Sequence, residues 1–249
     1  MAHRPNTLIL SLSTLALCCF ISASSLAGQL TVYTWFDYFP ERFIQQFEQR
    51  SGHTVKLVYF YSDFERDTQI FNAEDSYDLI VTDTHTLPSF ERSDLFLEAE
   101  ATSIPNLKNL DPRWRNTCED LAVPFFWGGT GIAYRKISGD DDWEVVFPKE
   151  GTSIWMDCLS MTKRGKDKAL AYEFSNFLLA PQVTAELSEA IWIATPNLAA
   201  RTSLRKDYLD DTSVFPSDAV LEKIEVETVP SIALQTIRNK ILLSLQNNR

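Results

Sequence analysis

Apolar positions along the first third of the chain recur with two different periods. Three runs rich in β-branched and aromatic residues predict strands. They are residues 30–35 (LTVYTW), 54–61 (TVKLVYFY) and 77–83 (YDLIVTD). Between the first two runs, Phe43, Ile44 and Phe47 have helical spacing in a segment that stops at Gly52. A polar segment that we predict to be helical separates the second run from the third. This order predicts an α/β fold, with a parallel sheet and helices on both faces.

The stretch SIWMDCL, residues 153–159, combines a tryptophan and an aspartate two positions apart in an apolar run. Side chains of a strand alternate between its two faces. Trp155 and Asp157 would therefore share one face of a strand, and Ile154 and Met156 the other. A strand that carries an aromatic ring and a carboxylate on one face is a candidate part of a binding site.

Similar residues gather where the other predicted strands end, which is where an open parallel sheet binds its ligand. They are Trp35, Tyr38 and Asp83, with Trp155 and Asp157 as a further contribution. Aromatic faces and carboxylates together suit an ammonium ligand, because rings attract cations and carboxylates accept charge-assisted hydrogen bonds. We expect the nearby Asp37 to cap the helix that begins near Pro40, rather than to bind ligand.

The N-terminus has the pattern of a secretion signal. Residues 1–27 have a basic start at Arg4, an apolar run and a small residue at Ala27. Cleavage there changes the net charge of −11 to −12, because Arg4 is lost and no acidic residue is. This balance disfavours nucleic acid and anionic membranes as partners.

Few residues of the mature chain suit metal or redox chemistry. Only Cys118 and Cys158 remain, and the sequence fits either a single disulfide or two buried free cysteines. The histidines that remain are His53 and His85, which are too few for a zinc-type cluster. No motif implies a cofactor.

Five segments, in order, resemble the bacterial periplasmic spermidine/putrescine-binding proteins. They are LTVYTWFDYFPERFIQQFEQRSGHTVKL, YDLIVTDTHTL, VPFFWGGTGIAY, VVFPKEGTSIWMDCLSM and ATPNLAAR. The resemblance implies an α/β fold of the periplasmic binding protein-like type (type II), in which two lobes close over a linear polyamine. It covers nearly the whole mature chain.

The resemblance implies ligand-binding roles for seven residues. The family's tryptophan and tyrosine after the first strand fall on Trp35 and Tyr38, and its tryptophan and aspartate of the WMD block fall on Trp155 and Asp157. The remaining positions are less regular. Asp83 and His85 stand where typical members have serine and tyrosine, Ile193 and Ala194 stand where many have tyrosine, and the glutamine contact falls near Glu227.

One part of the family's pattern is missing. Members build most of their second lobe between the counterparts of GIAYRK and WEVVFPKEG, where this chain has only ISGDDD. The resemblance therefore implies a first lobe at residues 29–136 and 153–201, with a reduced second lobe at 137–152 and 202–249. Without the family, ISGDDD reads as a polar turn that closes a hairpin.

Three functions fit the sequence. The first is a periplasmic polyamine-binding subunit that serves the inner-membrane permease of an ABC importer or, as in sensor-type relatives, a membrane-bound signalling receptor. The second is a shortened remnant that no longer binds usefully. The third is an enzyme that uses Asp83 and Asp157 as a glycosidase carboxylate pair, and we place it last because the two acids suit a cation at least as well. Half a cleft predicts binding no better than about millimolar, and self-association through the apolar face of residues 232–245.

Overall fold

The computed structural model describes residues 27–72, 76–91, 93–135, 143–227, 236, 237, 240 and 241. Residues 1–26 of the predicted signal and most of the C-terminal apolar segment lie outside these ranges. The elements in chain order are β1 (Gln29–Trp35), α1 (Glu41–Ser51), β2 (Thr54–Phe60), α2 (Asp63–Asn72), β3 (Leu79–Asp83), α3 (Leu87–Glu91), η1 (Pro105–Asn109), η2 (Glu119–Leu121), β4 (Val123–Gly129), β5 (Ile132–Arg135), β6 (Trp143–Val146), β7 (Thr152–Met161), α4 (Lys168–Leu178), α5 (Pro181–Ile191), η3 (Ala200–Ser203), α6 (Lys206–Leu209), α7 (Asp218–Leu221) and β8 (Ile224–Val226).

The opening of the chain folds as its periodicity predicts. Strands β1, β2 and β3 match the three predicted runs, and α1 buries Phe43, Ile44 and Phe47. Gly52 ends α1 in a left-handed conformation at φ 73°, and its N–H donates to the Glu48 carbonyl over 2.9 Å. None of the helices in the described ranges has the length and apolarity that crossing a membrane requires.

The predicted capping role of Asp37 is wrong. The N-cap position of α1 is Pro40, and no side chain caps the helix there. Asp37 instead adopts a left-handed conformation at φ 58°, which aspartate tolerates better than most residues. The turn at Asp37 brings Tyr38 back toward the sheet. The Tyr38 N–H donates to the Trp35 carbonyl, with 3.4 Å between nitrogen and oxygen.

The main sheet is mixed rather than parallel. Its strands run in the order β2-β1-β3-β7-β4, and β8 pairs with β7. The three opening strands are parallel, as predicted, but β7 runs antiparallel to both β3 and β4. An apolar run shows that a strand is buried and says nothing about its direction, so the sequence pattern could not reveal this reversal.

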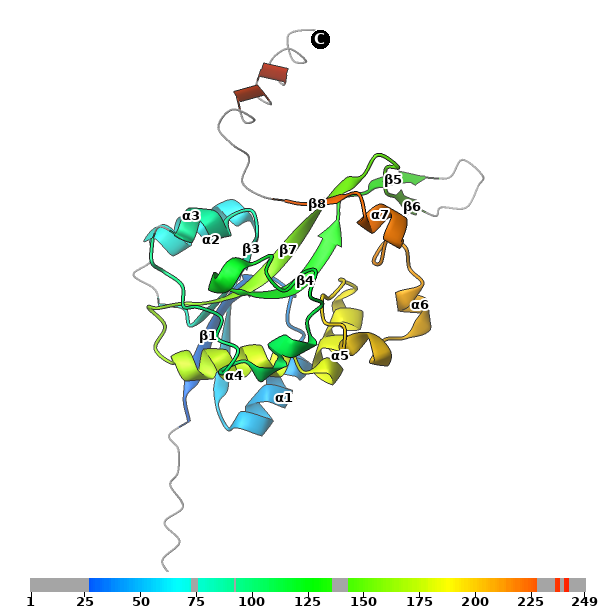
Figure 1. Ribbon diagram of the computed structural model, residues 1–249. Helices are drawn as coiled ribbons and strands as arrows, with labels where there is room; N and C mark the ends of the chain where they lie inside the picture. Colours follow the sequence, from blue (N-terminus) through cyan, green and yellow to red (C-terminus); the bar gives the residue numbers. More distant parts are fainter. Residues whose placement is uncertain are drawn as a thin grey trace, which may run out of the picture.

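Helices cover both faces of this sheet (Figure 1). On one face α1 packs against α4, where the Phe47 and Phe174 rings are 4.9 Å apart. On the other α2 packs against α3, where the Phe71 and Phe90 rings are 4.8 Å apart. The predicted α/β layering is therefore confirmed.

Cys118 and Cys158 form a disulfide with their Cα atoms 6.0 Å apart. Cys118 immediately precedes η2, and Cys158 lies in the middle of β7. The bond ties the segment before β4 to β7, an interior strand of the main sheet, and the two cysteines are therefore paired rather than free.

A small second sheet projects beyond the ends of β4 and β7 (Figure 1). It is the antiparallel hairpin β5–β6, in which Ile132 pairs with Val146 and Arg135 with Trp143. The side chains of Ile132 and Trp143 are 58% and 68% exposed, although both residues are apolar. Among the described residues, this hairpin represents the second lobe. The fold is therefore one complete α/β lobe with a truncated second lobe.

The predicted lobe boundaries differ from this arrangement in two places. The prediction places β5 in the first lobe (29–136), but β5 pairs with β6 outside the main sheet. The prediction places the residues after 201 in the second lobe, yet the hydroxyl of the buried Tyr208 donates to the Ile193 carbonyl over 2.7 Å. A large tyrosine with a buried polar partner holds this segment on the first lobe.

Candidate ligand-binding site

A pocket of about 340 Å³ opens at one edge of the main sheet. Five of the seven predicted ligand-binding residues line it together with two others. The lining residues are Trp35, Tyr38, Asp63, Asp83, Trp155, Asp157 and Ile193. Every one of them lies outside the β5–β6 hairpin, so the described residues of the truncated lobe do not line the pocket.

Strand direction explains why these residues meet. β1 and β3 are parallel and end at Trp35 and Asp83, so their carboxyl ends reach the same edge of the sheet. Because β7 runs the opposite way, the first half of that strand reaches this edge too. Asp157 of β7 is the direct cross-strand partner of Asp83, which places the two side chains on one face of the sheet.

The alternation predicted for residues 153–159 holds. Trp155 and Asp157 line the pocket, while Ile154 and Met156 are fully buried on the opposite face. Trp155 packs directly on Gly128 of β4, its cross-strand partner, where a Cβ atom would clash with the indole ring. Trp35 is fixed by the Phe60 ring at 4.5 Å. The pocket thus has two half-buried, well-supported indole rings.

Asp157 is the most deeply placed carboxylate of the pocket, with 7% of the residue exposed. It accepts a hydrogen bond from the Tyr38 hydroxyl. The pKa of Asp157 is raised from 3.8 to about 7, chiefly by burial. The Tyr38 hydrogen bond works against this rise in pKa, and the nearby charge of Asp83 adds to it. Burial also raises the pKa of Tyr38 well above 10, so Tyr38 remains a hydrogen-bond donor.

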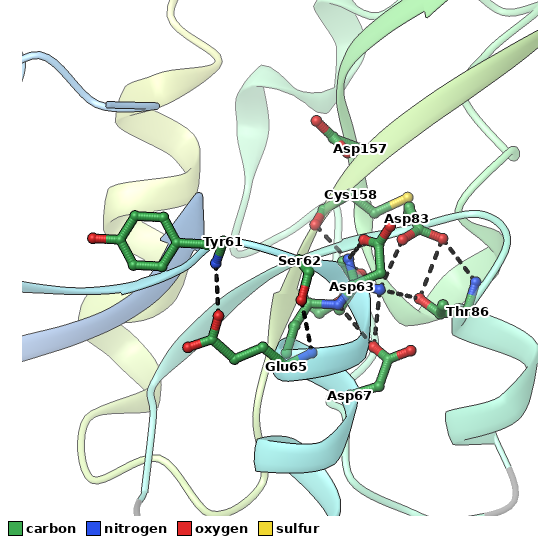
Figure 2. A network of polar contacts seen from close by, with 12 residues as sticks. Tyr61, Ser62, Asp63, Glu65, Asp67, Asp83, Thr86, Asp157 and Cys158 are labelled. Carbon is green, nitrogen blue, oxygen red and sulfur yellow. Dashed lines mark hydrogen bonds and ion pairs between the residues drawn. The ribbon is translucent and has the colours of Figure 1, made fainter. Parts of the chain in front are cut away.

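Asp83 is held differently, in a network around the buried guanidinium of Arg66. Figure 2 shows the carboxylates of Asp63, Asp67 and Asp83 close together, with Asp157 outside the network of dashed contacts. Asp83 Oδ2 lies 2.8 Å from Arg66 Nη2, and Asp83 Oδ1 accepts from the Thr86 N–H over 2.8 Å. Both of its oxygens already have protein partners.

Two predicted ligand residues lie outside the pocket lining. His85 is exposed and does not line the pocket. Glu227 follows β8, where its Oε1 accepts a hydrogen bond of 2.6 Å from Ser153 and its carbonyl accepts one of 2.9 Å from Thr84. Glu227 therefore braces the start of β7 beside the pocket.

Sequence reasoning missed Asp63 and Arg66. Asp63 begins α2 just after β2, so the rule that selected residues at strand ends would have found it. Arg66 gave no signal, because a basic residue in a polar helix is ordinarily exposed. Ile193 was noted only as a departure from the family pattern. Within the described ranges, no three His, Cys, Asp or Glu side chains are arranged to hold a metal ion.

Comparisons with known proteins agree with this architecture. Residues 122–216 match the family model of bacterial extracellular solute-binding proteins. The norspermidine sensor of Vibrio cholerae is 23% identical over 338 positions, covering 95% of this chain and 93% of the sensor. The spermidine/putrescine-binding periplasmic protein of Salmonella typhimurium is 24% identical over 322 positions, covering 87% and 91%.

Among solved structures, the spermidine/putrescine ABC transporter substrate-binding protein of Streptococcus pneumoniae is similar with a TM-score of 0.81. It is 18% identical, and the match covers 88% of this chain and 99% of that one. The resemblance and the binding-protein fold predicted from the sequence are confirmed.

The match to the Vibrio cholerae sensor leaves about a hundred of its 338 positions without a residue of this chain, because 95% of 249 residues can fill only the rest. That total is about the size of a small domain.

Proposed function

We propose that this protein, which is similar along its length to the periplasmic spermidine/putrescine-binding proteins, binds a polyamine and delivers it to the permease of an ABC importer. The observation that carries the proposal is the buried carboxylate of Asp157, which lines one pocket together with the indole rings of Trp35 and Trp155. The carboxylate receives an ammonium group, while Trp35 and Trp155 cover the alkyl chain. The export signal predicted at residues 1–27 and the Cys118–Cys158 disulfide fit a periplasmic location.

A sensor function is the second candidate, because the match to the norspermidine sensor extends over 95% of this chain. In that case the liganded protein contacts a membrane-bound receptor instead of a permease. The neighbouring genes, encoding a permease and an ATPase or a receptor, distinguish the two functions.

The glycosidase alternative has less support. Asp83 is engaged by Arg66 and Thr86, and Asp157 by Tyr38, so neither carboxylate faces the pocket without a protein partner. The relatives described above are named as binding or sensor proteins.

The binding proposal is tested by titrating the purified protein with putrescine and spermidine, following tryptophan fluorescence. Butane-1,4-diol is the control, since it keeps the length of putrescine without its charge. We expect both amines to bind with dissociation constants near millimolar, because the described pocket encloses its ligand from one lobe only, and we expect no response to the diol. No response to either amine at tens of millimolar would exclude the proposal.

Polyamine binding is expected to weaken as the pH falls below about 7. A proton on Asp157, whose pKa is about 7 in the free protein, competes with the ligand's ammonium group. Affinity for putrescine should be constant above pH 8 and about tenfold lower at pH 6. Chemical-shift titrations at a series of pH values measure this change.

His85→Gln is the matched control for that series, since the imidazole lies outside the pocket lining. The variant should keep the pH dependence. A flat wild-type profile, or a dependence that disappears with His85, would contradict the role given to Asp157.

A further inference from the structure

Arg66 is an unusual residue for the neighbourhood of a cation-binding pocket. The residue is fully buried and carries a positive charge beneath the site. Its Nη1 lies 3.0 Å from Asp63 Oδ1, as an ion pair without hydrogen-bond geometry. Its Nε donates to Asp67 Oδ1 over 2.9 Å, and its Nη2 donates to Thr86 Oγ1 over 2.9 Å. A buried guanidinium needs such partners to be stable, so the cluster is built around it.

The two carboxylates at the inner end of the pocket consequently differ. Asp83 pairs with Arg66 and accepts from both the N–H and the hydroxyl of Thr86, over 2.8 Å and 3.2 Å. Asp157 receives the Tyr38 hydroxyl and has no salt bridge in the described part of the chain. Although the two are cross-strand partners, only Asp83 has a counter-charge of its own (Figure 2).

Resting on the polyamine-binding function proposed above, we propose that Arg66 is a positioning residue that sets the charge of the pocket. Its guanidinium takes the place of a ligand cation at Asp83, so that Asp83 makes no ligand contact and Asp157 receives the ligand's ammonium group. The pocket therefore takes a single ammonium group at its inner end. Asp83 and His85, two departures from the family pattern, thus have different roles: Asp83 belongs to an internal ion pair and His85 lies on the surface.

The alternative is that Asp83 contacts the ligand directly. A double-mutant cycle distinguishes these two possibilities. If Asp83 only pairs with Arg66, removing both side chains leaves ligand binding nearly intact. If Asp83 contacts the ligand, binding stays weak in the double variant. The variants are Asp83→Asn, Arg66→Gln and the double variant, titrated with putrescine at pH 8.

We expect Asp83→Asn to weaken putrescine binding at least tenfold, because it leaves Arg66 with less compensation near the ligand. Arg66→Gln should bind putrescine as well as the wild type or several-fold more tightly, even though its melting temperature falls. A purely structural role would lower affinity together with stability. The double variant should bind within about threefold of the wild type.

The proposal is overturned if the double variant binds as weakly as Asp83→Asn. If Arg66→Gln does not fold, the comparison of Asp83→Asn with the double variant decides. Asp157→Asn, added to each background, should remove most of the binding in all of them.

A failure of the polyamine function would appear separately, as a wild-type protein that does not respond to putrescine. In that event the cycle is measured on the ligand-free protein, through the pKa of Asp157 in carbon-detected carboxyl spectra. Arg66→Gln should raise this pKa, Asp83→Asn should lower it, and the double variant should restore it. Equal values in all four proteins would overturn the role of Arg66.

Discussion

Replacing Asp157 by asparagine is expected to weaken polyamine binding and to stabilise the ligand-free protein at the same time. The loss of a hydrogen bond to a charged group weakens binding by about 1.5–3 kcal/mol. The gain in stability comes from the pKa of Asp157, which is about 7 in the folded protein against 3.8 ordinarily. Between these two values the folded state holds a proton that the unfolded state has lost, so stability falls as the pH rises, and the full penalty applies above pH 7.

The penalty is on the order of 4 kcal/mol, and asparagine avoids the part that comes from burying a charge. Denaturant unfolding at pH 8 should therefore show Asp157→Asn to be more stable by roughly 2–4 kcal/mol, with little difference near pH 4. Asp207→Asn, the same change at a side chain that is 67% exposed, should alter neither property. If Asp157→Asn is less stable than the wild type at pH 8, burial of the Asp157 carboxylate does not destabilise the folded protein.

Removal of the Cys118–Cys158 disulfide is expected to have the largest effect on stability. The cysteines are 40 positions apart, and a cross-link that closes a loop of this length stabilises the folded state by about 4 kcal/mol in the chain-entropy model. The double variant Cys118→Ala/Cys158→Ala should lose about this amount of unfolding free energy. Chemical denaturation at pH 8 measures it.

Reduction of the wild-type protein provides the control. Dithiothreitol should lower wild-type stability to the level of the double variant and leave the double variant unchanged. Equal unfolding free energies with and without the bond would mean that the segment before β4 is already ordered in the unfolded ensemble, or that the bond is strained.

Much of the fold could be predicted from local patterns. The opening strands and α1 follow from periodicity, because each buries one face and the side chains repeat accordingly. The direction of β7 could not be predicted this way, since a strand buried on both faces is apolar whichever way it runs. The reversal matters for function, because it brings Trp155 and Asp157 to the edge where β1 and β3 end.

The candidate site was predictable to the extent that its chemistry lies at strand ends. Trp35, Tyr38, Asp83, Trp155 and Asp157 were selected in this way, and all of them line the pocket. The roles within the set were not predictable. Whether a carboxylate is free or paired depends on a residue such as Arg66, which comes from another element and is visible only once α2 packs beside β3.

The pocket's location on a single lobe also sets how long a ligand stays. With a dissociation constant near millimolar and association near the diffusional ceiling of about 10⁸ M⁻¹s⁻¹, the residence time is roughly 10 μs. Domain closure in proteins takes microseconds to milliseconds. A polyamine would therefore leave this site as fast as a lobe could close over it, or faster, so that occupancy follows the instantaneous polyamine concentration and no bound ligand is stored.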